Sequence, residues 1–218
     1  MDNKRPFGSY DNIFRLVLVG NSNVGKTALT RKFSNKQFTE NYDATIGIDY
    51  GSTIIKISNS KLIKCQIWDT AGQEVYAPLI ASYYKDTSGF IIVFDVSSRK
   101  SFNKVKYWLQ EIEKHKNHNI NVPKILVGNK IDKYGQRNVT KVEAIDFAHK
   151  HKLLYQETSV IQNKNVDKIL LMLCDEIYNQ IDSLPGIKYG SNRIELNDGV
   201  QNNIDVDPDK FTCNCSIN

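Results

Sequence analysis

The sequence predicts an α/β domain in which a mostly parallel β-sheet is covered by helices on both faces. Short apolar runs typical of strands alternate with longer helix-like runs through most of the chain. Two of the strand candidates, residues 90–96 and 124–127, are short runs that are apolar at all but one position each, as expected for strands with both faces covered. The chain has 218 residues, 40% of them hydrophobic, which is enough for one such domain with its own core.

The expected elements follow one another from residue 13 onward. Residues 13–19 form a buried strand, and residues 26–35 form a helix. Residues 50–57 and 62–68 are two strands joined by the turn-forming residues 58–61, so we expect them to pair as a hairpin. The remaining expectations are helices over 77–84, 100–116, 140–150 and 165–181 and a short strand over 153–156.

Three parts are predicted along the chain: a flexible start over residues 1–10, one domain over 11–182 and a flexible tail over 183–218. The strand–helix alternation stops near Ile181, and Asn, Asp, Gly and Ser are frequent beyond it. Ligands of parallel sheets bind beyond the carboxyl ends of the strands. We therefore expect the functional site in the loops that follow the strands.

Composition argues against several functional classes. The net charge of +5 is mild and no basic stripe with interleaved aromatics is present, so we expect no nucleic-acid binding. The apolar run 90–94 is too short to span a bilayer, the first residues lack a signal-peptide pattern, and Asp2 excludes myristoylation. Cys65 and Cys174 lie in apolar segments and are expected to be reduced core residues, which favours a cytosolic compartment.

Residues 20–27, GNSNVGKT, match the phosphate-binding pattern G-x-x-x-x-G-K-[ST] between a predicted strand and a predicted helix. The two glycines let the backbone wrap around phosphates, and the following N–H groups point inward at the helix N-terminus. Lys26 is expected to reach the β- and γ-phosphates, and Thr27 to offer its hydroxyl to Mg²⁺. An ordinary glycine-containing turn is the alternative. The candidate phosphate-binding residues are Gly20, Asn23, Val24, Gly25, Lys26, Thr27 and Ala28.

A second segment, residues 69–73 (DTAGQ), follows the strand that ends at residue 68. Asp69 can hold a magnesium-bound water, although an aspartate after a strand also often caps a turn. Gly72 would bring a backbone N–H to the γ-phosphate, and Gln73 would orient the attacking water. A solvated loop glutamine is the alternative for Gln73.

Residues 129–132, NKID, follow the strand at 124–127 and supply what a guanine edge needs. The Asp132 carboxylate can accept from N1–H and the exocyclic amine, a donor pair that adenine lacks. Asn129 can tie loops together and bond N7, and the stem of Lys130 can lie along the base. This pattern is weak alone, but after a phosphate loop it predicts a guanine nucleotide.

Together these motifs resemble the Ras superfamily of small GTPases, and most of all the Rab family. The resemblance covers roughly residues 11–182 and the last few residues, and it includes WDTAGQE at 68–74, ATIGID at 44–49 and YYK at 83–85. It implies a three-layer P-loop nucleotidase fold with a six-stranded sheet. It also implies slow GTP hydrolysis by a membrane-anchored switch of vesicle trafficking.

The same resemblance assigns further site residues. Thr45 would be the switch threonine whose hydroxyl joins Mg²⁺ in the GTP state, alongside Thr27 and Asp69. Phe38 would pack against the guanine. Residues 158–160, including Ser159 and Val160, would form the last base-recognition loop. No arginine lies between residues 39 and 45, where some relatives carry one for catalysis, so we expect slow intrinsic hydrolysis that needs an activating protein.

The chain also departs from the family pattern. Val160 and Ile161 replace the usual Ala and Lys, from which we hypothesise faster GDP release than is usual for a Rab. Val75 and Tyr76 replace the usual Arg and Phe, which leaves the choice of partner open. In addition, Tyr50 replaces a Phe and Asn21 a common Asp. Ile46, Ile48, Trp68 and Tyr84 could form a patch between the switches, or half of them could face the core.

The terminal residues CNCSIN resemble a prenylation site, with Cys213 and Cys215 as the candidate lipidation residues. A C-a-a-X reading of residues 215–218 and two free thiols are the alternatives. The tail is acidic, so charge cannot provide a second membrane signal, and stable anchoring favours two lipids.

The resemblance implies the partners of a Rab: an exchange factor, a GTPase-activating protein, a GDP-dissociation inhibitor, an escort protein and effectors at the switches. It implies a monomer on the cytoplasmic face of an intracellular membrane, cycling with the cytosol. Two rival readings are a guanine-nucleotide-dependent scaffold with negligible hydrolysis and a soluble Ran-like transport factor. Gln73 and Thr45 favour the switch over the scaffold, and the paired terminal cysteines argue against the Ran-like factor.

Overall fold

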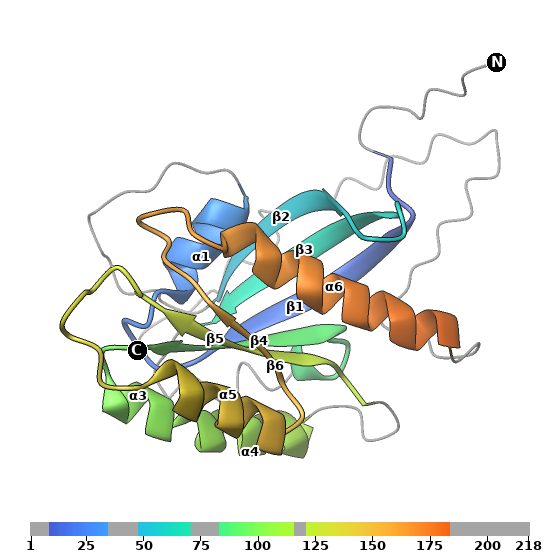
Figure 1. Ribbon diagram of the computed structural model, residues 1–218. Coiled ribbons are helices and arrows are strands. Elements are labelled where there is room, and N and C mark those ends of the chain that lie inside the picture. The colour runs from blue at the N-terminus through green and yellow to red at the C-terminus, as the bar shows by residue number, and fades with distance from the viewer. Residues whose placement is uncertain (1–8, 35–47, 71–82, 116–120, 184–218) are drawn as a thin grey trace, which may run out of the picture.

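A computed structural model of the chain describes residues 9–34, 48–70, 83–115 and 121–183. Within these residues six strands form one sheet in the order β2-β3-β1-β4-β5-β6 (Figure 1). Only the β2–β3 pair is antiparallel, so the sheet is mostly parallel and the expected hairpin is confirmed. The strands are β1 Asn12–Val19, β2 Ile48–Lys56, β3 Leu62–Thr70, β4 Gly89–Asp95, β5 Lys124–Asn129 and β6 Leu154–Glu157.

Helices cover both faces of the sheet, which confirms the three-layer prediction. Figure 1 shows α1 and α6 on one face and α3, α4 and α5 on the other. Crossovers of this kind allow neighbouring strands to run parallel. The helices are α1 Lys26–Phe33, α3 Arg99–Asn103, α4 Val105–His115, α5 Lys141–Lys150 and α6 Val166–Ser183.

The burial of the strands follows their place in the sheet. Every residue of β4 is buried, because this central strand has a neighbour on each side and helices on both faces. β3 alternates between buried and half-buried residues, since the helices cover its two faces unequally. The apolar runs within 90–96 and 124–127 therefore belong to strands that have a neighbour on each side and are covered on both faces, as the sequence predicted.

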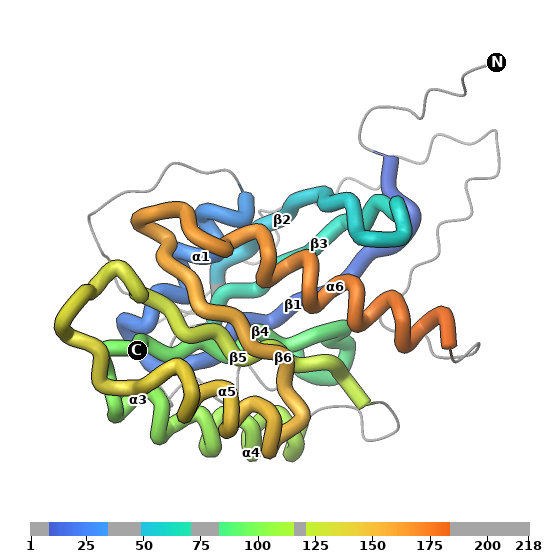
Figure 2. The backbone as a smooth tube through the Cα atoms, viewed as in Figure 1, coloured from blue at the N-terminus to red at the C-terminus, as the bar shows by residue number. Residues whose placement is uncertain are grey.

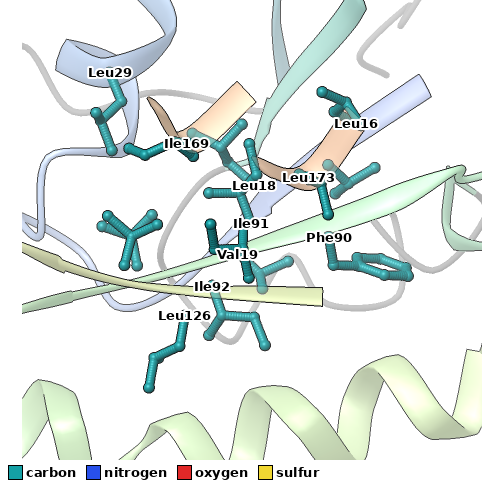
Figure 3. Packing of buried hydrophobic residues seen from close by; sticks show 14 of the residues in the cluster. Leu16, Leu18, Val19, Leu29, Phe90, Ile91, Ile92, Leu126, Ile169 and Leu173 are labelled. Atoms are coloured by element: carbon teal, nitrogen blue, oxygen red, sulfur yellow. The ribbon is translucent and has the colours of Figure 1, made fainter. Parts of the chain in front are cut away.

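The core fills the space between the sheet and the helices on each side. In Figure 3, Ile169 and Leu173 of α6 lie beside Leu18 of β1, between Leu29 of α1 on one side and Leu16 of β1 on the other, and all five side chains are buried. Ile91, Ile92 and Leu126 of the two neighbouring strands are also labelled there, and Trp108 of α4 is buried on the other side of the sheet. Burial of these side chains contributes about 1.5–3 kcal/mol each to stability.

One predicted helix is in fact two. The expected helix 100–116 is interrupted at Lys104, which separates α3 from α4. Ser98 caps α3 by accepting from the backbone N–H of Ser101, so the helix also begins one residue earlier than expected. The apolar periodicity of the sequence continues through the interruption and could not reveal it. The expected helix 77–84 lies largely outside the described residues.

The predicted patch between the switches is wrong in one member. Tyr84 is only 3% exposed, and its ring packs edge-on against Phe90 at 5.2 Å, so it belongs to the core. Trp68 is half-buried and its ring lies 5.1 Å from those of both Tyr50 and Tyr83. Trp68 thus forms a partly exposed aromatic cluster with Tyr50 and Tyr83, while Ile46 and the side chain of Ile48 lie outside the described part of the chain.

Cys65 and Cys174 are buried free thiols with their Sγ atoms 3.5 Å apart, which confirms their assignment as reduced core residues. Among the described helices none is both long and apolar enough to span a membrane. The turns that follow β1, β4, β5 and β6 lie at one end of the sheet, as the backbone trace shows (Figure 2).

Candidate nucleotide-binding site

The phosphate-loop segment, residues 20–25, makes a tight turn between β1 and α1, as predicted. Gly20 has φ +145°, and a Cβ there would lie 2.2 Å from the carbonyl oxygen of Val93. Gly25 has φ +98°, and a Cβ there would lie 2.3 Å from Nδ2 of Asn129. Both positions therefore exclude any side chain, and the backbone of the loop can pass close to its neighbours.

The N-terminus of α1 opens toward this loop. Its N-cap residue is Gly25, which has no side chain to cap the first amides, and no acidic residue lies in the first turn. The amides of Lys26, Thr27 and Ala28 are then among the helix groups without an intrahelical acceptor. A helix terminus of this kind favours an anion such as a phosphate.

Lys26 places a buried cation over the loop. Its side chain is buried, and Nζ donates to the carbonyl oxygens of Gly20 at 2.9 Å and Asn21 at 3.0 Å. Burial lowers the pKa of Lys26 to about 8, against a smaller opposing effect of the Asp69 charge. A buried ammonium held by two neutral carbonyls is well suited to bind an anionic phosphate oxygen.

Asp69 and Thr27 form the candidate metal site. Thr27 Oγ1 donates to Asp69 Oδ2 at 2.5 Å, and Oδ1 of Asp69 is buried without a hydrogen-bond partner among the described residues. Burial raises the pKa of Asp69 to about 6, partly offset by the Thr27 hydrogen bond and the Lys26 charge. Hydroxyl and carboxylate oxygens are hard ligands, so this pair fits Mg²⁺.

The register of the sheet brings Asp69 to the phosphate loop. β1 and β3 pair in parallel with Leu18 opposite Asp69, and Thr70 Oγ1 donates to the carbonyl oxygen of Leu18 at 2.6 Å. Asp69 therefore lies one residue before the end of β3 at Thr70. This position confirms the expected strand-end location.

The NKID segment is bound to the phosphate loop and to the last loop. Asn129 Nδ2 donates to the carbonyl oxygen of Val24 at 2.8 Å, as the predicted loop-tying role requires. Lys130 has φ +65°, and its Nζ donates to the carbonyl oxygen of Asn23. Asp132 Oδ1 accepts from Ser159 Oγ at 2.5 Å. Three loops distant in sequence are thus joined into one wall.

The loop after β6 is a closed turn. The backbones of Ser159 and Lys164 exchange hydrogen bonds of 3.2 and 2.9 Å, and Thr158 Oγ1 donates to the Lys164 carbonyl at 2.7 Å. Val160 is buried, so its branched side chain fits the core, whereas Ile161 is 71% exposed. The bulk of Val160 is accommodated without opening this turn.

Asp95 is a site residue that the sequence analysis missed. It ends β4, is nearly buried and pairs with Lys130 Nζ at 3.0 Å, while Ser97 donates to it from N and Oγ at 2.8 and 2.6 Å. Burial alone would raise the pKa of Asp95, but the hydrogen bonds from Ser97 and Lys130 outweigh it and lower the pKa. The sequence did contain a signal for this residue, because an acidic residue ends an apolar strand that lies between the strands leading to the phosphate loop and to the NKID segment.

Most of the predicted site residues lie together at this end of the sheet, and the rest fall outside the described residues. Asp69 and the candidate phosphate-binding residues lie around the phosphate loop, with Asn129, Lys130, Asp132, Ser159 and Val160 beside them. The positions outside the described residues are Phe38, Thr45, Ile46, Gly72, Gln73, Cys213 and Cys215.

Comparison with known proteins agrees with this geometry. The family model described as "Ras family" matches residues 15–179, well over half of the chain. The GTP-binding protein YPT1 of Saccharomyces cerevisiae is 42% identical over 168 residues, which are 77% of this chain and 80% of that protein. Three features of the structure agree with this family: the strand order, the phosphate loop with its two glycines, and the hydrogen bond from Asn129 to Val24. The chain therefore belongs to the Ras family, as a Rab-type small GTPase that hydrolyses GTP in intracellular vesicle trafficking.

Proposed function

We propose that the site at this end of the sheet binds GTP and GDP with Mg²⁺, with the base and the phosphates held by different groups of residues. The observation that carries this proposal is the hydrogen bond from Asn129 Nδ2 to the Val24 carbonyl, which joins the base motif to the phosphate loop. One nucleotide can then bridge the two segments.

The base lies against the wall formed by residues 129–132 and 158–160. Asp132 accepts from the guanine N1–H and the exocyclic amine, and Ser159 fixes the direction of its carboxylate. A site built for this donor pair discriminates against adenine, because adenine offers the half-buried carboxylate no such pair of donors.

Lys26, Thr27 and Asp69 act at the phosphates. Lys26 Nζ binds β- and γ-phosphate oxygens, and the amides at the start of α1 add further donors. Thr27 and Asp69 hold Mg²⁺, which supplies neutralisation of the charge on the phosphate oxygens. The burial of Lys26 and Asp69 excludes water and strengthens their electrostatic effect.

The remaining roles rest on family likeness alone. Thr45 would join Mg²⁺ in the GTP state, Gly72 would bring its backbone N–H to the γ-phosphate, Phe38 would cover the base, and Gln73 would orient the attacking water. These contacts order the switch segments while GTP is bound and release them after hydrolysis.

Regulators and effectors are the partners of such a switch. We assign an exchange factor, a GTPase-activating protein, a GDP-dissociation inhibitor and an escort protein to this chain, with effectors binding beside the Tyr50–Trp68–Tyr83 cluster. Prenylation of Cys213 and Cys215 would anchor the protein to the cytoplasmic face of an intracellular membrane. Mass spectrometry of the native C-terminus tests the anchor, and an unmodified terminus contradicts it.

Nucleotide exchange followed by single-turnover hydrolysis tests the central proposal. We expect magnesium-dependent GDP binding that ATP does not displace, accelerated release with EDTA, and slow hydrolysis abolished by Gln73→Leu. Gln136→Leu, at an exposed position, is the matched control and should leave hydrolysis unchanged. If the protein binds nucleotide but its rate of hydrolysis does not depend on Gln73, the role assigned to Gln73 is wrong. If ATP binds as well as GTP, the assignment of residues 129–132 to guanine recognition is wrong.

A further inference from the structure

Trp108, on a helix outside the nucleotide pocket, is hydrogen-bonded to the phosphate loop. Its side chain is 1% exposed, and the indole Nε1 donates to Asn21 Oδ1 at 3.0 Å. The two residues are 87 positions apart, and the bond joins α4 to the loop that follows β1.

Asn21 is also one of the two residues that hold Lys26. Its backbone carbonyl accepts from Lys26 Nζ at 3.0 Å, beside the carbonyl of Gly20. The side chain and the backbone of Asn21 therefore link the indole on one side to the phosphate-binding ammonium on the other. Gly20 has no side chain through which it could be held in this way.

We propose that Trp108 is a positioning residue for nucleotide binding: its indole N–H fixes Asn21, and Asn21 fixes the ammonium of Lys26 against the β- and γ-phosphates. This proposal rests on the proposed role of Lys26.

Core packing alone does not account for this arrangement. An indole N–H buried without an acceptor is costly, so a tryptophan in a core needs one partner. Here the partner is the side chain of a phosphate-loop residue.

The bond from Trp108 restrains the start of the loop, whereas the bonds from Lys130 and Asn129 reach its other end at Asn23 and Val24. The side chain of Asn21 is half-buried and those of Ser22 and Asn23 are exposed, so little packing fixes the loop between Gly20 and Val24. A small displacement of Asn21 would move its backbone carbonyl and would therefore shift the preferred position of Lys26 Nζ, which donates to that carbonyl. Affinity for a triphosphate should fall more than affinity for a diphosphate, because Lys26 would contact both the β- and the γ-phosphate of the triphosphate but only the β-phosphate of the diphosphate.

A double-mutant cycle on full-length protein tests the proposal. We would compare wild type, Trp108→Phe, Asn21→Ala and the double variant by release of GDP and of a non-hydrolysable GTP analogue. Each single variant should release the analogue about 3- to 10-fold faster, which corresponds to the loss of one hydrogen bond. The release of GDP should change less. The double variant should be no faster than the faster single variant, because both changes remove the same link.

The control separates positioning from stability. Ile112→Val removes one buried methyl group from the same helix and should lower the melting temperature without changing the ratio of the two release rates. If Trp108→Phe behaves like Ile112→Val, or if the two single effects multiply in the double variant, the positioning role is wrong.

A spectroscopic readout reports the bond directly. The chain contains two tryptophans, Trp68 and Trp108, so the Trp68→Phe variant assigns both indole N–H resonances. The Trp108 resonance should shift in Asn21→Ala and on replacement of GDP by the GTP analogue. An indole resonance unchanged by both would overturn the proposal. Wild-type protein that binds neither nucleotide would instead overturn the proposed function, so the two failures are distinguishable.

Discussion

The base wall and the phosphate wall of the pocket differ in how far the protein itself satisfies their polar groups. At the base wall, Asp132 is bound by Ser159 and Lys130 is paired with Asp95. At the phosphate wall, Lys26 and Asp69 are buried in positions where burial shifts both pKa values against the charged form. One wall is complete without ligand, whereas the other carries charges that a ligand must neutralise.

The shifted pKa values of the phosphate wall make the stability of the protein depend on pH. The pKa of Asp69 is raised from its ordinary value near 3.8 to about 6. The protonated carboxyl is therefore favoured in the folded state, and this contribution to stability is lost as the pH rises from 3.8 to 6. The pKa of Lys26 is lowered to about 8, so its contribution is lost as pH falls from 10.5 to 8. At neutral pH both charges oppose folding, each by about 3 kcal/mol. In the function proposed above, phosphates and a cation would relieve this cost, and the hydrogen bonds of the base wall would stay in place through the cycle.

The largest expected effect comes from removing the charge of Lys26. Lys26→Met keeps the length of the side chain, so nucleotide-free protein should gain stability, by up to about 3 kcal/mol. GTP affinity should fall by about 100-fold or more, because charged hydrogen bonds contribute about 1.5–3 kcal/mol each. Urea unfolding without nucleotide and equilibrium titration measure the two effects. Lys150→Met, at an exposed position of α5, is the control, and a destabilised Lys26→Met would contradict the comparison.

The second expected effect comes from Gly25, where the two walls meet. Gly25→Ala would place a Cβ against Asn129 Nδ2 and break its bond to the Val24 carbonyl. Strain and the lost bond together should cost about 2–4 kcal/mol of stability and weaken GDP binding by about 30-fold. Gly135→Ala is the matched control, since Gly135 also has a positive φ of 77° but no atom of the described residues lies within 4 Å of the place that its Cβ would occupy. Thermal unfolding that is equal for both variants would show that the walls are not joined at Asn129.

A smaller effect is expected at the base wall. Asp95→Asn removes the charge that holds Lys130 and should speed GDP release by about 5- to 10-fold. Because the pKa of Asp95 is lowered, its stabilising contribution is present above about pH 4 and is lost on further acidification. The difference in unfolding midpoint between wild type and variant should therefore close below that pH. Asp146→Asn, at an exposed position of α5, is the control and should show no such closure.

The smallest effect concerns the loop after β6. If Val160 and Ile161 speed GDP release, Val160→Ala combined with Ile161→Lys should slow it by a few-fold. The buried Val160 and the paired backbones of Ser159 and Lys164 leave little room for a larger change. Stopped-flow release of labelled GDP measures the effect, and an unchanged rate would count against the hypothesis.

The sequence by itself determined the class of the fold and the chemistry of the site. The phosphate loop and the NKID segment could be read directly, because their chemistry depends on residues adjacent in the chain and on glycine geometry at Gly20 and Gly25. The buried central strands could be predicted as well, since their apolar runs reflect burial on both faces.

Only the tertiary structure decided which distant side chains meet. Asp95 pairs with Lys130 because β4 and β5 lie side by side in a register that places Asp95 opposite Asn129. Tyr84 is buried, and Trp108 reaches Asn21, because of how helical segments pack against the sheet. A sequence pattern records local geometry and average burial, whereas strand register and helix packing follow from the whole core at once.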